Sequence, residues 1–205
     1  ILYYYVRVIR LEQIEQLNNF NLKSGDIIIT SHHNITNPLT FATHNIFNLL
    51  ATNGLGTHAG IIVVIDNVPF IYHMQNKILF DCYTQTYREK KPILMCFREW
   101  QMQYSGTIWV YKIKEEIKDI LSFVEETNNL DFSVDQLKWF NTVVKLPINY
   151  KNEYEICTGL VSRFLAHTNI IKDVILLTPT DIEDILQSSD KYYYPQLVKK
   201  FNWSI

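Results

Sequence analysis

His58 and Cys157 are the two residues whose types and positions point most directly to chemistry. His58 comes just before the apolar run IIVVI at 61–65, which is typical of a buried strand. Cys157 comes just before the run LVSRFL at 160–165, whose apolar residues fall on one face of a helix. A thiol at a helix start beside an imidazole on a strand is the arrangement of a cysteine hydrolase, in which the thiolate is the nucleophile.

The position of Cys157 at a helix start is expected to activate its thiol. Unpaired N–H groups and the helix dipole favour an anion there, which predicts a pKa below the ordinary value of about 8.5 for cysteine. The backbone N–H of Cys157 is a natural donor to the oxyanion that forms during attack on a carbonyl group. Ordinary structural roles stay open for both residues. Cys157 would then be a buried cysteine on a helix, and His58 a histidine at a strand end whose ring is hydrogen-bonded to the backbone.

His73 is placed to complete such a site, because a hairpin brings it beside His58. Two apolar runs flank a D-N turn at 66–67, and a tight turn there puts Gly60 opposite His73. His58 is on the same side as Gly60, so the two histidines are diagonal neighbours with backbones roughly 7–8 Å apart. Cysteine–histidine enzymes use a third polar group to hold the imidazole in the right tautomer. We expect His73 to be that group.

The other histidines and cysteines show no metal-ligand spacing. Zinc sites need Cys or His residues at fixed short spacings, so we expect no metal ion at His32, His33 or His44. The count of 3 cysteines without a CxxC pair disfavours a disulfide framework and favours a reducing compartment such as the cytoplasm. Structural roles are expected for Cys82 and Cys96, and a helix end for His167.

The composition is that of an ordinary globular protein. The chain has 205 residues, of which 47% are hydrophobic and 20% charged, and a net charge of −2. It has no basic patch with interleaved aromatics, which argues against nucleic-acid binding. It also has no apolar run of the roughly 18–20 residues that span a bilayer. The sequence begins at Ile1 without a methionine, so we expect a truncated or processed product. Membrane association through a lipid or through a missing N-terminal segment stays open.

The expected elements give an α+β domain with an antiparallel sheet. Helices are expected at 9–19, 38–50, 115–127, 133–145 and 157–167. One strand is expected directly after a turn that occupies 22–26. Further strands are expected at 58–65, 69–75 and 107–113, with weaker candidates at 78–81 and 93–97 and a late edge strand at 192–195. Thr180 and Glu183 match a capping box for a last helix that ends near residue 187.

Taken together, these motifs resemble the circularly permuted NlpC/P60 group of papain-like proteins. The group includes the YiiX/YebB-like proteins and their poxvirus relatives and, more distantly, the lecithin:retinol acyltransferase type. The matching pieces are LKSGDII at 22–28, HAGII at 58–62, His73 and CTGLV at 157–161, which together cover roughly residues 20–167. YiiX-like members commonly carry Glu where this chain has His73, and acyltransferase-type members carry His, so peptide-like and lipid substrates both stay open.

The resemblance implies one permuted papain-like domain over 1–205, with a helical segment at 1–20 and a helical extension at 170–205. It implies a cysteine hydrolase or acyltransferase that attacks an amide or ester bond through a thioacyl intermediate, without a metal or organic cofactor. Cys157 would be the nucleophile, His58 the base and His73 the orienting group. The substrate, a small molecule, a peptide or a lipid, would occupy a cleft at Cys157. The protein would act in the cytoplasm, or in a host cytoplasm or virion if it is viral.

Two functions without catalysis share the same fold and stay open. One is a binding module for a lipid or an amino-acid-like ligand, and the other is a structural protein of a virus. A sulfur of Cys157 within about 4 Å of a His58 ring nitrogen favours catalysis, and a separation above about 6 Å favours the binding module.

Overall fold

A computed structural model describes residues 21–32, 58–75, 77–104, 106–132, 154–155, 157–175 and 177–199 of the chain. The helices expected at 9–19, 38–50 and 133–145, and the helical segment expected at 1–20, lie outside these described residues.

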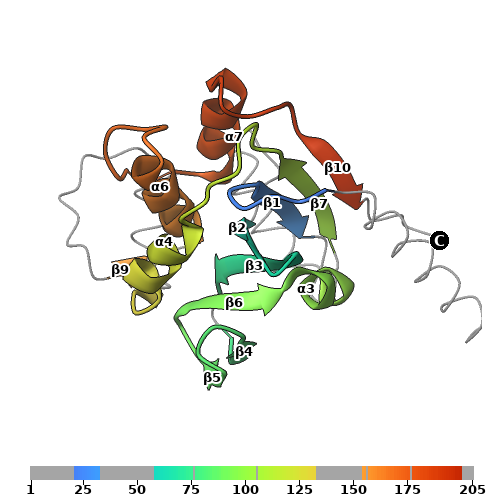
Figure 1. Ribbon diagram of the computed structural model, residues 1–205, viewed down its shortest axis with the longest axis vertical. Helices are drawn as coiled ribbons and strands as arrows, with labels where there is room; N and C mark the ends of the chain where they lie inside the picture. Colours follow the sequence, from blue (N-terminus) through green and yellow to red (C-terminus); the bar gives the residue numbers. More distant parts are fainter. Residues whose placement is uncertain are drawn as a thin grey trace, which may run out of the picture.

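A six-stranded sheet forms the centre of the molecule, with the strand order β10-β7-β1-β2-β3-β6 (Figure 1). Every neighbouring pair in it is antiparallel, as the sequence predicts. Its strands are β1 (Ile27–His32), β2 (His58–Ile65), β3 (Val68–Met74), β6 (Pro92–Cys96), β7 (Gly106–Tyr111) and β10 (Gln196–Lys199). Two small ribbons accompany it: β4 (Leu79–Asp81) with β5 (Thr86–Arg88), and β8 (Asp131–Phe132) with β9 (Tyr154–Glu155).

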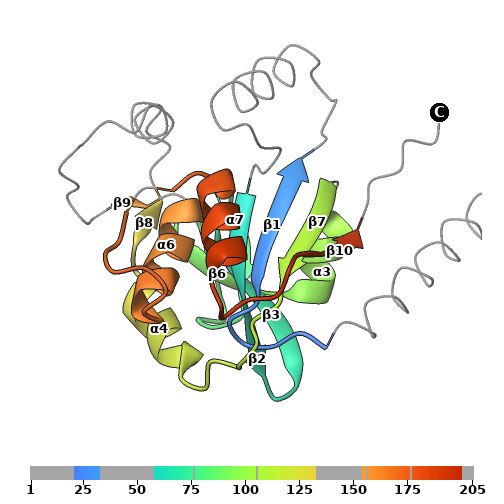
Figure 2. The same ribbon diagram turned by 90° about the horizontal axis from the view of Figure 1, so that it is seen from above.

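Helices cover both faces of the sheet, which makes the fold a mixed α+β arrangement (Figure 2). The described residues contain α3 (Phe97–Gln103), α4 (Ile120–Thr127), α6 (Cys157–His167) and α7 (Pro179–Ser188). In Figure 2, α4, α6 and α7 lie on one side of the sheet and α3 lies on the other. Within the described ranges, none of the helices has the length and apolar character needed to cross a membrane.

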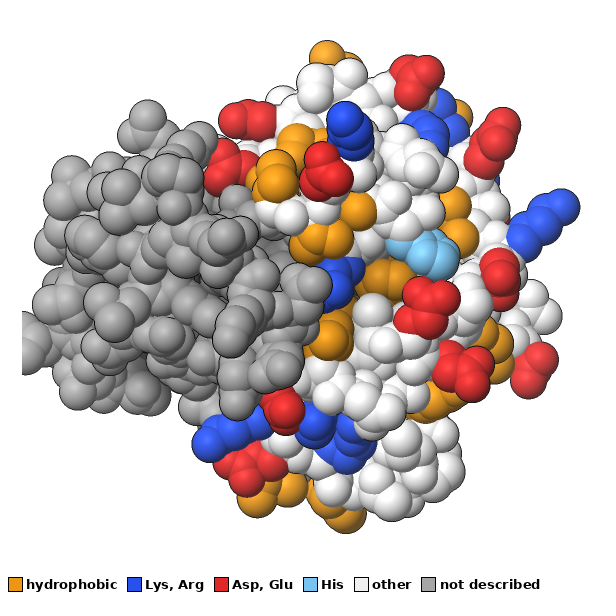
Figure 3. Space-filling view, turned by 90° about the vertical axis from the view of Figure 1, so that its left-hand side faces the viewer, with side chains coloured by type: hydrophobic (Ala, Val, Ile, Leu, Met, Phe, Trp, Pro, Cys, Tyr) orange, Lys and Arg blue, Asp and Glu red, His pale blue; other side chains and the backbone are white. Residues whose placement is uncertain are grey.

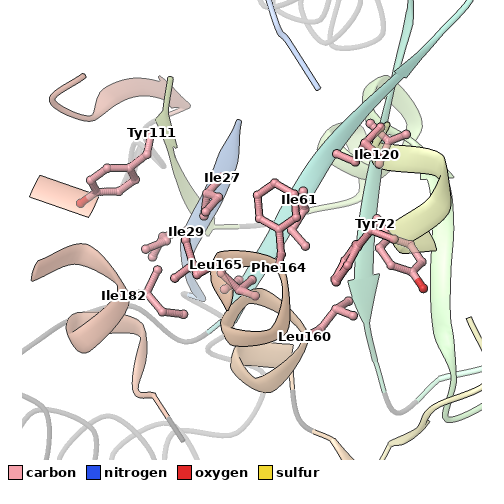
Figure 4. Close-up of a cluster of buried hydrophobic side chains, with 14 of the residues drawn as sticks. Ile27, Ile29, Ile61, Tyr72, Tyr111, Ile120, Leu160, Phe164, Leu165 and Ile182 are labelled. Atoms are coloured by element: carbon pink, nitrogen blue, oxygen red, sulfur yellow. The ribbon is translucent and has the colours of Figure 1, made fainter. Parts of the chain in front are cut away.

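Strand alternation divides the core into two layers. Ile27 and Ile29 of β1 pack with Phe164 and Leu165 of α6, whereas Ile28 packs on the α3 side of the sheet. Figure 4 shows Phe164 and Leu165 directed toward the sheet residues, and all five side chains are fully buried. Because both faces of the strand are covered at 27–29, all three of these residues are apolar.

The β2–β3 hairpin turns at Asp66 and Asn67, whose φ angles are 50° and 63°. Two consecutive residues with positive φ form the tight turn that suits the twist of a hairpin, and Asp and Asn tolerate this conformation well. The predicted register is confirmed, because Gly60 pairs with His73.

The Gly25-Asp26 motif ties the start of β1 to the end of β7. The buried Asp26 carboxylate accepts hydrogen bonds from the backbone N–H groups of Lys23 (2.9 Å) and Ile113 (2.8 Å) and pairs with Lys112 Nζ at 2.6 Å. Gly25 has a φ of 99°, and a Cβ there would lie 2.8 Å from Ile117 Cγ1, so only glycine fits. Gly25 and Asp26 therefore have a structural role in the fold.

Several element boundaries differ from the sequence predictions. The helix expected at 115–127 begins at Ile120, and in the segment before it the N–H of Ile117 donates to Ser24 O (3.0 Å). The weak strand at 93–97 ends at Cys96, and α3 follows directly. That helix and strand β5 were not predicted.

The C-terminal part of the chain holds a helix and then a strand. The capping box of α7 uses Thr178 and Asp181, not Thr180 and Glu183, because Pro179 occupies the first helical position and so moves the cap to the preceding residue. The strand expected at 192–195 does not form there, where Tyr192 makes only an isolated bridge with Ile113. The late strand is β10, at 196–199, which pairs with β7 at the edge of the central sheet. The expected helical extension 170–205 thus also supplies an edge strand.

Charged side chains of both signs are interspersed on the described surface over α4 and α6, with apolar side chains between them (Figure 3). Leu121 of α4 is an exposed apolar residue, at 43% exposure.

Candidate active site

The three residues singled out by the sequence come from three elements of the fold. His58 is the first residue of β2, His73 is the last residue but one of β3, and Cys157 is the first residue of α6. Leu160 of α6 lies in the same core cluster as Ala59 of β2, which holds the helix start beside the strand start.

A direct hydrogen bond joins the two histidines. His58 Nε2 lies 3.0 Å from His73 Nδ1, and the rings are T-shaped with centroids 5.2 Å apart. Gly60 of β2 is the pairing partner of His73 and lies two residues after His58. A Cβ at Gly60 would lie 3.0 Å from Ile71 Cδ1 and 3.2 Å from His73 Cβ. The absence of a side chain at Gly60 therefore leaves the room that His73 needs.

His73 is a neutral imidazole. The ring is fully buried, and burial, followed by the charge of His58, holds the pKa of His73 well below the ordinary histidine value. A neutral imidazole carries one proton, so one ring nitrogen donates and the other accepts. Within the described residues, His73 Nε2 has no hydrogen-bond partner, so every polar contact that it makes there is at Nδ1.

Aromatic side chains of α3, and Tyr104 directly after it, lie beside His73. The Trp100 indole lies T-shaped to His73 with ring centroids 6.0 Å apart, and it stacks between Phe97 and Tyr104. Trp100 is 3% exposed. Phe97, Trp100 and Tyr104 follow one another at spacings of three and four residues, which is typical of one face of a helix. This spacing could have revealed the aromatic cluster from the sequence.

The thiol of Cys157 lies beside the peptide that links His58 to Ala59. Burial raises the pKa of the Cys157 thiol, while the backbone N–H groups of Ala59, Thr158 and Cys157 itself act to lower it. Because burial is the largest effect, the expectation of a lowered pKa is wrong. The distance between the sulfur and a His58 ring nitrogen stays a prediction.

Gln75 is a further polar contact of the site that the sequence did not reveal. Its side-chain Nε2 lies 3.3 Å from His73 Nδ1, the same nitrogen that faces His58. Gln75 follows His73 by two positions, and this spacing puts both side chains on one side of an extended chain. The two-residue spacing can be recognised in the sequence, whereas the hydrogen bond depends on the conformation of the Gln75 side chain.

The remaining candidate residues do not join this site. Among the described residues, no group of three or more His, Cys, Asp or Glu side chains could hold a metal ion. Cys82 and Cys96 are free, half-buried thiols. His167 ends α6, as expected, with its Nδ1 3.9 Å from a Glu126 carboxylate oxygen. The side chain of His32, and all of His33 and His44, lie outside the described residues.

The chain is similar to a solved structure at low sequence identity. It is the crystal structure of the metalloprotein YiiX from Escherichia coli O157:H7, a DUF1105 protein, which has 11% sequence identity and a TM-score of 0.49. The alignment covers 87% of this chain and 89% of that chain. No protein-family model and no curated protein matches the chain. The antiparallel α+β architecture is established by the structure itself, and the permuted papain-like fold stays a proposal.

Proposed function

We propose that this chain is a permuted papain-like cysteine hydrolase or acyltransferase that acts on an amide or ester bond. The observation that carries the proposal is the 3.0 Å hydrogen bond between His58 Nε2 and His73 Nδ1. The thiol of Cys157 lies beside the backbone N–H of Ala59, the residue that follows His58. Because Nε2 of His58 is engaged by His73, Nδ1 is the nitrogen through which His58 would exchange a proton with the thiol. A nucleophile, a base and an orienting group are the parts that such an enzyme needs.

The first half of the proposed reaction forms a thioacyl enzyme. His58 Nδ1 takes the proton of Cys157 as the sulfur bonds to the carbonyl carbon, and the carbonyl π electrons move onto the oxygen. When the tetrahedral intermediate collapses, the bond to the leaving amine or alcohol breaks, and the leaving group takes the proton from Nδ1.

The second half releases the acyl group. Water in a hydrolase, or an alcohol or amine in a transferase, loses a proton to His58 Nδ1 and attacks the thioester carbon. The carbon–sulfur bond then breaks, and the sulfur regains the proton. Neither half requires a metal or an organic cofactor.

The start of α6 supports the charge that develops on oxygen. The backbone N–H groups of Cys157 and Thr158 both lie near the sulfur, where the first turn of a helix leaves its N–H groups unpaired. One well-placed donor to an oxyanion contributes about 2.7–4 kcal/mol to the barrier reduction. A raised thiol pKa further implies that His58 removes the proton during attack, rather than holding a thiolate beforehand.

The substrate class that fits this chemistry is an acyl compound, either peptide-like or a lipid. We infer a reducing compartment such as the cytoplasm, because all three cysteines, Cys82, Cys96 and Cys157, are free thiols. Contact with a membrane would follow only if the acyl group comes from a lipid.

One observation favours a second candidate function. Burial and a raised pKa are also the properties of an unreactive structural thiol. A non-catalytic module that binds a lipid or an amino-acid-like ligand is therefore the alternative.

Trapping of the acyl enzyme tests the proposal. The protein is incubated with p-nitrophenyl acetate and quenched in acid, and its cysteine peptides are analysed by mass spectrometry. We expect an acetyl group on Cys157 in the wild type and in the matched control Cys82→Ser, and none at that position in Cys157→Ala. Acetylation of Cys82 and Cys96 without Cys157 would favour the binding module.

A further inference from the structure

Two potential donors converge on one nitrogen of His73. Nδ1 lies 3.0 Å from His58 Nε2 and 3.3 Å from the side-chain nitrogen of Gln75. An unprotonated imidazole nitrogen has a single lone pair, and an amide NH₂ group can only donate. With the amide of Gln75 in this orientation, Nδ1 of His73 is therefore the acceptor, and the proton of His73 is on Nε2.

The same contact determines which nitrogen of His58 carries a proton. If His73 Nδ1 accepts, then His58 must donate from Nε2, and a neutral His58 has an unprotonated Nδ1. If the Gln75 amide were turned over, its oxygen would accept a hydrogen bond from a protonated His73 Nδ1. His58 Nε2 would then have to accept, and the proton of His58 would move to Nδ1.

These two arrangements differ in whether His58 can act as a base. A base must present an unprotonated nitrogen to the thiol. In the first arrangement Nδ1 is unprotonated and can take the proton of Cys157. In the second arrangement Nδ1 already carries a proton, so the thiol cannot be deprotonated through it.

We propose that Gln75 is a positioning residue: its side-chain amide, by donating to His73 Nδ1, selects the tautomer of His73 and through it the tautomer of His58. This inference rests on the proposed function for its catalytic consequence, but the tautomers themselves can be measured without any substrate. Gln75 is well suited to substitution, since it lies just beyond the end of β3 and is only half-buried.

The test uses ¹⁵N NMR of the full chain labelled at histidine, because the ring nitrogen shifts report which nitrogen is protonated. Variants His58→Gln, His73→Gln and His167→Ala assign the signals. In the wild type we expect His73 protonated at Nε2 and His58 protonated at Nε2. In Gln75→Glu, the added carboxylate can only accept, so a proton is expected at His73 Nδ1 and the proton of His58 is expected to move to Nδ1.

Gln75→Met serves as the matched variant, because it keeps the length of the side chain and removes the amide without adding an acceptor. It is expected to show both His73 tautomers. The rate of Cys157 acetylation by p-nitrophenyl acetate is expected to fall roughly 10²-fold in Gln75→Glu, which is the lower end of the contribution of a general base.

A wild-type His73 protonated at Nδ1, or tautomers that stay unchanged in both Gln75→Glu and Gln75→Met, would overturn the inference. If the tautomers change as expected but Cys157 of the wild type is never acetylated, the proposed function fails while the selection of tautomers by Gln75 stands.

Discussion

At the scale of single residues, burial opposes the usual effect of a helix N-terminus on the thiol of Cys157. The N–H groups around the sulfur favour an anion, but loss of hydration weighs more, and the pKa is raised. His73 is affected in the corresponding way: burial keeps its ring neutral, and the unprotonated nitrogen of a neutral ring can accept a hydrogen bond from His58. Both residues therefore rest in uncharged forms, and charge would arise only during the reaction.

Alkylation of Cys157 by iodoacetamide tests this description of the thiol. The thiolate is the reactive form, and a raised pKa lowers its fraction at neutral pH. We expect Cys157 of the wild type to react more slowly than a free thiol at pH 7, with a pH midpoint above the ordinary cysteine value of about 8.5. Cys157→Ser gives the background from Cys82 and Cys96. A midpoint below that of a free thiol would indicate a preformed thiolate and contradict the raised pKa.

At the scale of elements, the β2–β3 hairpin is the part of the fold that sequence reasoning predicted best. A two-residue turn fixes the register, and the register fixes the neighbours of His58 and His73. Helix α6 was also predicted with its exact bounds, because its apolar spacing is regular. Helix α3 was missed because its aromatic residues follow directly on a strand. The contact of Gln75 could not be predicted, since it depends on a side-chain conformation rather than on a pattern.

The cap of α7 gives a test at this scale, because the sequence and the structure point to different threonines. Thr178 Oγ1 accepts a hydrogen bond from the N–H of Asp181 at 3.1 Å, and the Asp181 carboxylate accepts one from the N–H of Thr178 at 2.9 Å. We expect Thr178→Ala to lower the free energy of unfolding by about 1 kcal/mol, measured by urea denaturation. Thr180→Ala is the matched control, since its hydroxyl has no hydrogen-bond partner among the described residues, and it should be close to neutral. A larger loss of stability for Thr180→Ala than for Thr178→Ala would indicate that Thr180 caps the helix, as the sequence predicts, and would contradict the structure.

At the scale of the whole molecule, the pair Asp26–Lys112 joins the start of β1 to the segment after β7. The carboxylate is fully buried and the Lys112 side chain is 12% exposed. Burial raises the pKa of Asp26, and the hydrogen bond from Lys112 is the largest effect that lowers it. Tyr192 also reaches this region from beyond α7, donating to Gly25 O at 2.8 Å. Residues far apart in the chain thus stabilise the sheet end opposite the candidate site.

Loss of Lys112 should therefore be costly for stability. Lys112→Met keeps the aliphatic chain and leaves the buried Asp26 without its cation, and we expect unfolding to become easier by about 3–5 kcal/mol. Lys91→Met is the matched control, because the pair Lys91–Asp131 has a similar distance of 2.7 Å but exposures of 29% and 52%. That change should alter stability by about 0–1 kcal/mol. Equal losses in the two variants, measured by urea denaturation, would contradict the structural importance of Asp26.

The central claim is that His58 serves as the base for Cys157. The most direct measurement is the rate constant for acetylation of Cys157 by p-nitrophenyl acetate at pH 7, compared between the wild type and His58→Gln. Glutamine can still donate to His73 Nδ1 but cannot take a proton at this pH, so the rate is predicted to fall by about 10²–10⁴-fold. A rate at Cys157 that is unchanged by His58→Gln, or no higher than the rate at Cys82 of the wild type, would contradict the claim.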